Sequence, residues 1–121
     1  MLADLAVLSE ITHLDLRGTS VTDAGLAHLA KLPQLVELDL SECGQLSDGG
    51  MPHLSGLTNL VRLNLWRVNI TDDGVAHLAG LTNLEWLNLD NTLLSDAGLE
   101  HLAGMTQLEF LHLGSTSACS C

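Results

Sequence analysis

Leucine and other apolar residues recur along this chain in one order that restarts every 24 or 25 residues. Each repeat opens with the pattern L-x-x-L-x-L, as at Leu35, Leu60, Leu84 and Leu108, and the full repeats carry four further apolar positions after it. A fixed period of this length is typical of a solenoid, whose units stack because one unit cannot bury its apolar face alone. We therefore expect function on an open face and not in a closed pocket.

The repeats are expected to form one leucine-rich domain over residues 1–121. A degenerate first repeat opens at Ile11, and one added residue near Gly44 and Gln45 falls where a turn can absorb it. The predicted units are a partial helix at 1–10, repeats at 11–34, 35–59, 60–83 and 84–107, and a partial terminal repeat at 108–121.

The first part of each repeat has the alternation of a β-strand. Leu38 and Leu40 are expected to point inward, whereas Glu37, Asp39 and Ser41 are expected to point outward. Five such strands are predicted to form one parallel sheet, at 12–17, 36–41, 61–66, 85–90 and 109–113.

The second part of each repeat has a spacing of three. Val75, Leu78 and Leu81 suit a short helix or helical turn, with Thr71 or Asp72 as its N-cap. Stacking such units places a parallel sheet on the inner side of a curve and short helices on the outer side.

The combined pattern resembles a known family. L-x-x-L-x-L followed by Thr, and then T/S-D-x-G-L-x-H-L-x-x-L, resembles leucine-rich repeats. It is most similar to the short bacterial forms of roughly 24 residues and to the cysteine-containing repeats of F-box proteins, through Leu40–Cys43 and Leu46–Gly50. The resemblance covers about Leu2 to Ala118. It implies a right-handed α/β solenoid with a concave sheet and convex helices, but no particular ligand.

The charge of the chain argues against one class of partner. Fifteen carboxylates stand against four Lys and Arg side chains, for a net charge of −11. Nucleic-acid binding needs a basic surface, so we expect no such partner. There is no run of about twenty apolar residues, so we expect no membrane span. Residues 1–8 lack the features of a signal peptide, which favours a reducing compartment such as the cytoplasm.

Three cysteines do not indicate a disulfide framework. Cys43 occupies the slot that Thr19 and Thr92 hold in other repeats, and it is expected to be a buried, inert thiol. Cys119 and Cys121 lie on a small polar tail, where a frayed terminus and a ligand or disulfide role are both open.

Histidine recurs at one slot, which invites a metal-site interpretation. Zinc needs ligands within about 2 Å of one point, whereas equivalent side chains of neighbouring repeats lie roughly 5 Å or more apart. We therefore expect no metal and no cofactor. The recurring histidines are His28, His53, His77 and His101.

Aspartate and glycine also recur, just before and within the expected helices. The aspartates are expected to cap free N–H groups at their own helix start. Apart from Gly50, which follows Gly49, each glycine stands alone, unlike those of a phosphate-binding loop, and close packing is a sufficient reason for the column. The two columns are Asp23, Asp48, Asp72 and Asp96, and Gly25, Gly50, Gly74 and Gly98.

The outward strand positions do not repeat, and the candidate binding residues come from them. Trp66, Trp86 and Phe110 lie on successive strands and should form one diagonal stripe, with Arg62 and Arg67 beside it. Trp and Arg often anchor protein interfaces, although the same side chains can also stack for stability alone. The predicted binding residues are Arg17, Glu37, Asp39, Arg62, Asn64, Trp66, Arg67, Trp86, Asn88, Asp90, Phe110 and His112.

These features favour a recognition module that binds a protein or peptide through its concave sheet. The alternative is a structural or engineered repeat fragment with no ligand of its own, since the chain begins inside a helix and stops after a strand. No base–nucleophile pair or cofactor loop supports an enzyme. Because no polar caps are evident, we also expect end-to-end self-association.

Overall fold

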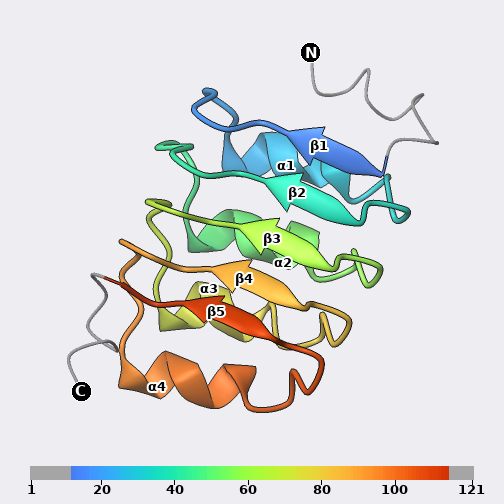
Figure 1. Ribbon diagram of the computed structural model, residues 1–121. Helices are drawn as coiled ribbons and strands as arrows, with labels where there is room; N and C mark the ends of the chain where they lie inside the picture. The colour runs from blue at the N-terminus through green and yellow to red at the C-terminus, as the bar shows by residue number, and fades with distance from the viewer. Residues whose placement is uncertain (1–11, 115–121) are drawn as a thin grey trace.

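One short strand from each repeat joins a single parallel sheet (Figure 1). The structure is a computed structural model that describes residues 12–114. The strands are β1 (His13–Asp15), β2 (Glu37–Asp39), β3 (Arg62–Asn64), β4 (Trp86–Asn88) and β5 (Phe110–His112), in the order β1-β2-β3-β4-β5. The parallel arrangement is confirmed. The strands are shorter than expected, although inter-strand bonds continue past them, as from Leu16 N–H to the Asp39 carbonyl at 2.8 Å.

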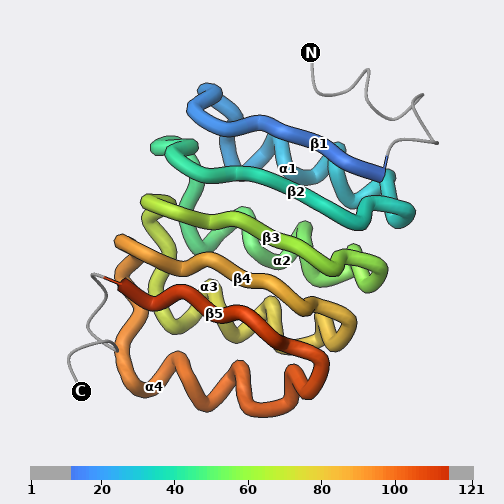
Figure 2. The backbone as a smooth tube through the Cα atoms, in the orientation of Figure 1, coloured from blue at the N-terminus to red at the C-terminus, as the bar shows by residue number. Residues whose placement is uncertain are grey.

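The opposite face of the sheet is covered by short helices (Figure 1). The chain completes one coil per repeat, so that helical segments stack beside one another as the strands do (Figure 2). These segments are α1 (Asp23–Leu29), η2 (Asp48–Gly50), α2 (Met51–Leu54), α3 (Asp72–Ala76), α4 (Asp96–Leu99) and η3 (Glu100–Leu102). The predicted cap of α3 is confirmed, because the Thr71 hydroxyl accepts the Asp73 N–H at 3.3 Å.

The core consists of the recurrent apolar slots. Residues one repeat apart pair in register, so that Leu38, Leu63 and Leu87 lie side by side. In the two middle repeats all seven slots are buried: Leu35, Leu38, Leu40, Leu46, Met51, Leu54 and Leu57, then Leu60, Leu63, Leu65, Ile70, Val75, Leu78 and Leu81. The pattern of apolar residues therefore predicted this core correctly.

The aspartate column does not cap its own helices, contrary to our expectation. The carboxylates of Asp23, Asp48 and Asp72 instead reach the N-cap residue of the next repeat and accept both its backbone N–H and its hydroxyl. We call each such pair an inter-repeat joint. The N···O distances are 2.8 Å for Asp23 and Ser47, 2.7 Å for Asp48 and Thr71, and 2.7 Å for Asp72 and Ser95.

The joints explain three members of the glycine column, Gly50, Gly74 and Gly98. A Cβ atom at Gly50 would lie 2.7 Å from the Asp23 carboxylate, and one at Gly74 would come still closer to that of Asp48. Glycine leaves the space that the carboxylate of the preceding repeat occupies, as the close-packing interpretation predicted.

Two residues that follow β2 are buried and hydrogen-bonded. The Cys43 thiol is fully buried and donates to the Leu16 carbonyl at 3.0 Å, as expected of a structural cysteine. Ser41 was expected to point outward, which is wrong. It is buried, because its hydroxyl turns back to donate to Asp39 at 2.6 Å. Cys119 and Cys121 lie outside the described residues.

Candidate functional site

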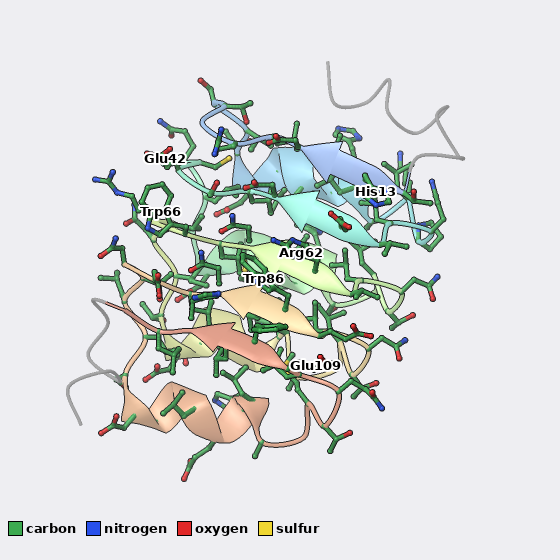
Figure 3. The ribbon with its side chains drawn as sticks, viewed as in Figure 1. His13, Glu42, Arg62, Trp66, Trp86 and Glu109 are labelled. Atoms are coloured by element: carbon green, nitrogen blue, oxygen red, sulfur yellow. The ribbon has the colours of Figure 1, made fainter. Side chains whose placement is uncertain are left out.

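The outward side chains of the five strands form a face that we call the sheet face (Figure 3). Because the strands pair in register, these side chains form rows that cross all five strands. The first row is His13, Glu37, Arg62, Trp86 and Phe110. The second row is Asp15, Asp39, Asn64, Asn88 and His112. The positions two residues further on hold Arg17, Ser41, Trp66 and Asp90. Apart from Arg67, which follows Trp66, every predicted binding residue lies in these rows.

The centre of the first row combines a cation with aromatic rings. The Arg62 guanidinium lies over the Trp86 ring, 4.0 Å from its centroid. The His112 ring packs against Trp86 at 5.2 Å. Next to Trp86 in the row, Phe110 is 58% exposed. At the other end, His13 Nε2 lies 3.2 Å from the Glu37 carboxylate.

The second row has a structural role that was not predicted from the sequence. In four of its members the side-chain Oδ1 accepts the backbone N–H two residues further on, which closes a turn at the end of the strand. The distances are 2.9 Å from Asp15 to Arg17, 2.9 Å from Asp39 to Ser41, 3.1 Å from Asn64 to Trp66, and 2.9 Å from Asn88 to Asp90. Their Oδ1 atoms are therefore already engaged.

The three aromatic residues do not form one stripe, contrary to our expectation. Trp66 lies four residues beyond Arg62 along its chain segment, a separation of about 13 Å in an extended strand. It belongs to a second group with Arg67, whose guanidinium lies 5.4 Å from the Trp66 ring centroid and 3.5 Å from Glu42. Figure 3 shows Trp66 and Glu42 on the same side of the sheet, away from Trp86. Alternation along the chain identifies the face, but only the register shows which residues share a row.

The second group occupies a strained part of the backbone. Glu42 and Arg67 have φ angles of 59° and 62°, in the left-handed region that glycine adopts most easily. In neighbouring repeats the same slot holds Gly18 and Asn91, which tolerate this conformation better. Glu42 and Arg67 therefore occupy a position where a smaller residue would cause less strain.

Two hollows flank Arg62 on the sheet face. The larger, of about 260 Å³, is lined by His13, Asp15, Glu37, Asp39, Arg62 and Asn64. The smaller, of about 200 Å³, is lined by Val61, Arg62, Glu85, Trp86, Glu109 and Phe110. Both are open to solvent, and carboxylates outnumber cations in each.

Two like-charge pairs were missed as candidates. Asp15 lies directly opposite Asp39, and Glu85 and Glu109 occupy equivalent positions on neighbouring strands. Within residues 12–114 the contacts between basic and acidic side chains are His13–Glu37 and Arg67–Glu42, so no basic side chain pairs with either like-charge pair there. The signal was present in the sequence, since residues one repeat apart share a slot.

The described residues offer no evident metal centre. In that part of the chain no three His, Cys, Asp or Glu side chains converge to hold an ion. The histidine column lies on the helical side, with His28 and His53 half-buried and His77 and His101 exposed. Among the described helices, none is long and apolar enough to cross a membrane.

Comparison with known proteins identifies the family. A family model described as leucine rich repeat matches residues 58–117. Internalin C2 from Listeria monocytogenes is similar over 96% of this chain, with 34% sequence identity and a TM-score of 0.84. The chain is a leucine-rich repeat protein. It spans 47% of the internalin C2 chain. Leucine-rich repeat proteins are in general protein-interaction modules and not enzymes.

More distant solved structures share the fold. Internalin InlF from Listeria monocytogenes is 22% identical, with a TM-score of 0.65, over 96% of this chain and 38% of its own. A TLR13 chain in a complex with ssRNA13 is 24% identical, with a TM-score of 0.72, over 95% of this leucine-rich repeat chain and 16% of its own. The TLR13 complex shows that the fold alone does not exclude RNA, so our expectation against nucleic acid rests on charge only. No curated protein sequence matches the chain.

Proposed function

We propose that this leucine-rich repeat protein binds a protein or peptide through its concave sheet face, with Arg62, Trp86 and Phe110 at the centre of the contact. The observation that carries the proposal is Phe110, a large apolar side chain that is 58% exposed beside Trp86. Exposed apolar groups that adjoin a cation and an aromatic ring are typical of interface anchors.

Stacking for stability accounts for only part of this arrangement. Arg62 covers one aromatic ring and His112 packs against the same ring, so Trp86 already has intramolecular partners. Most of the Phe110 side chain is exposed to solvent, and burying its apolar surface against a partner would be favourable. No observation favours catalysis, since an open sheet does not exclude water from a reaction.

The proposal can be tested by selecting displayed random peptides on the immobilised chain. Peptides enriched on the wild type should be lost on the double variant Trp86→Ala, Phe110→Ala. The matched control is Leu93→Ala, which removes a large side chain that is 60% exposed but lies outside the rows of the sheet face. Thermal melts establish that each variant is folded. Failure to enrich any peptide would favour a chain with no ligand of its own. Equal loss on the Leu93→Ala variant would contradict the assignment of binding to Trp86 and Phe110.

A further inference from the structure

Two pairs of like charges lie opposite each other, one on the sheet face and one directly beside it. Asp15 faces Asp39 across β1 and β2, and Glu85 neighbours Glu109 just before β4 and β5. Like charges directly opposite one another destabilise a sheet. Local conflicts of this kind are expected mainly where function maintains them.

The structural role of the second row does not require charge. Asn64 and Asn88 close the same backbone turn as Asp15 and Asp39 with a neutral side chain. Within residues 12–114 each of these two aspartates engages only Oδ1 in a hydrogen bond, which leaves Oδ2 and the negative charge unused. The turn explains the acceptor atom but not the carboxylate.

Each like-charge pair borders a hollow that suits a long basic side chain. The aspartate pair lines the hollow of about 260 Å³. The glutamate pair lines the hollow of about 200 Å³, where Val61 and Phe110 add apolar surface. Lysine and arginine combine an apolar stem with a cationic end, which matches a carboxylate pair beside apolar walls.

We propose that the partner of the sheet face presents two basic side chains, Lys or Arg, on an extended segment; this rests on the proposed function. One cation would lie between Asp15 and Asp39, and the other between Glu85 and Glu109. The two sites are three strands apart and three residues apart along the strands, about 17 Å in all. An extended segment spans that distance in about five residues. The net charge of −11 favours the same partner.

Three blocked synthetic peptides test the spacing, and the two that contain lysine have the same composition. GKSALSKG places its lysines five positions apart, GSKKALSG places them side by side, and GESALSEG replaces both by glutamate. In NMR titrations the spaced peptide should bind at least about fivefold more tightly than the adjacent one, and the glutamate peptide should bind weakest. Raising NaCl from about 50 to about 500 mM should weaken binding of the spaced peptide.

Neutral variants of nearly identical shape test the location. Asp15→Asn with Asp39→Asn, and separately Glu85→Gln with Glu109→Gln, should each weaken binding of the spaced peptide by about threefold or more. Both should leave the melting temperature unchanged or raised, because repulsion is relieved. The matched control, Asp73→Asn with Glu100→Gln, removes the same charge from the helical side and should leave affinity within about twofold.

Equal affinity for the two lysine peptides would overturn the paired arrangement. Equal weakening by the control variant would reduce the effect to net charge and overturn the assigned positions. Selected peptides that depend on Trp86 and Phe110 but lack two spaced basic residues would overturn this inference and leave the proposed function standing.

Discussion

At the scale of single residues, the glycine column determines how closely neighbouring repeats can pack. The space above Gly74 is occupied by a carboxylate from the preceding repeat and by Met51, whose Cγ would lie 3.1 Å from an added Cβ. The Asp48 carboxylate is held by hydrogen bonds to Thr71, and Met51 is fully buried in the core, so neither can move away freely. A single methyl group should therefore disturb two repeats.

We expect Gly74→Ala to lower the free energy of unfolding by about 1–3 kcal/mol through overpacking. Gly80→Ala is the matched control, because a Cβ there meets no atom within 4 Å. It should change the free energy of unfolding by less than about 0.5 kcal/mol. Urea denaturation of the two variants measures the difference, and equal stabilities would contradict the close approach of the aspartate.

At this scale, the role of a residue could be predicted from the sequence where that role depends on neighbours in the same chain segment. The apolar slots follow from period and alternation, and the cap at Thr71 follows from local backbone chemistry. The joints could not be predicted in the same way, because Asp48 acts on a residue 23 positions later. Ser41 was misplaced for a similar reason, since its hydroxyl bonds to Asp39 and turns away from solvent.

At the scale of the elements, the same slot contributes differently to stability in different strands. Leu63 in β3 is fully buried, whereas Leu111 in β5 is 36% exposed. Leu63→Ala should lower the free energy of unfolding by about 2–5 kcal/mol, because it leaves a cavity. Leu111→Ala should cost clearly less. Chemical denaturation of both variants checks this, and a loss below about 1 kcal/mol for Leu63→Ala would argue against the burial of this slot.

The joint between α3 and the next repeat predicts a response to acid. Hydrogen bonds from the Ser95 hydroxyl and N–H lower the pKa of Asp72 from its ordinary value of 3.8. A lowered pKa in the folded state stabilises the fold fully above the unfolded pKa of about 3.9, and this contribution is lost as the pH falls through the folded pKa. The stability advantage of the wild type over Asp72→Asn should therefore shrink below about pH 4.

Urea denaturation between neutral and acidic pH measures that advantage. Ser95→Ala keeps the carboxylate and removes the hydroxyl, so it should show part of the same reduced pH dependence. An advantage over Asp72→Asn that stays constant down to about pH 3 would mean that the joint does not act through charge.

Strand pairing also determines which side chains lie together on the sheet. Sequence alone placed Trp66, Trp86 and Phe110 on the sheet face but combined them into one stripe. Residues in the same slot of successive repeats meet across strands, and Trp66 is in a different slot from Trp86. Comparing slots across repeats separates the two groups, and it also reveals the Glu85–Glu109 pair.

At the scale of the whole molecule, the outer strands are the exposed edges of the described sheet. Within residues 12–114, β1 pairs only with β2 and β5 only with β4. Edge strands and partly exposed core residues favour association with another chain. We propose that the isolated chain associates end to end, which leaves the sheet face free for its partner.

Light scattering should then show a mass that rises with concentration. A polar capping repeat added at each end should return the mass to that of a monomer. Association that persists with both caps but disappears with Trp66→Ala and Trp86→Ala would place self-association on the sheet face and contradict the end-to-end arrangement.

The inter-repeat joints bear on how such a chain can change its length. Each full repeat carries the hydroxyl residue that the preceding unit needs and the carboxylate that the following unit needs, as Thr71 and Asp72 do in adjacent positions. An in-frame genetic duplication of one unit therefore supplies both halves of the new contact at once. A deletion of one whole unit likewise leaves no carboxylate without its hydroxyl. Gain or loss of whole units would alter the extent of the binding surface and leave the chemistry of stacking intact.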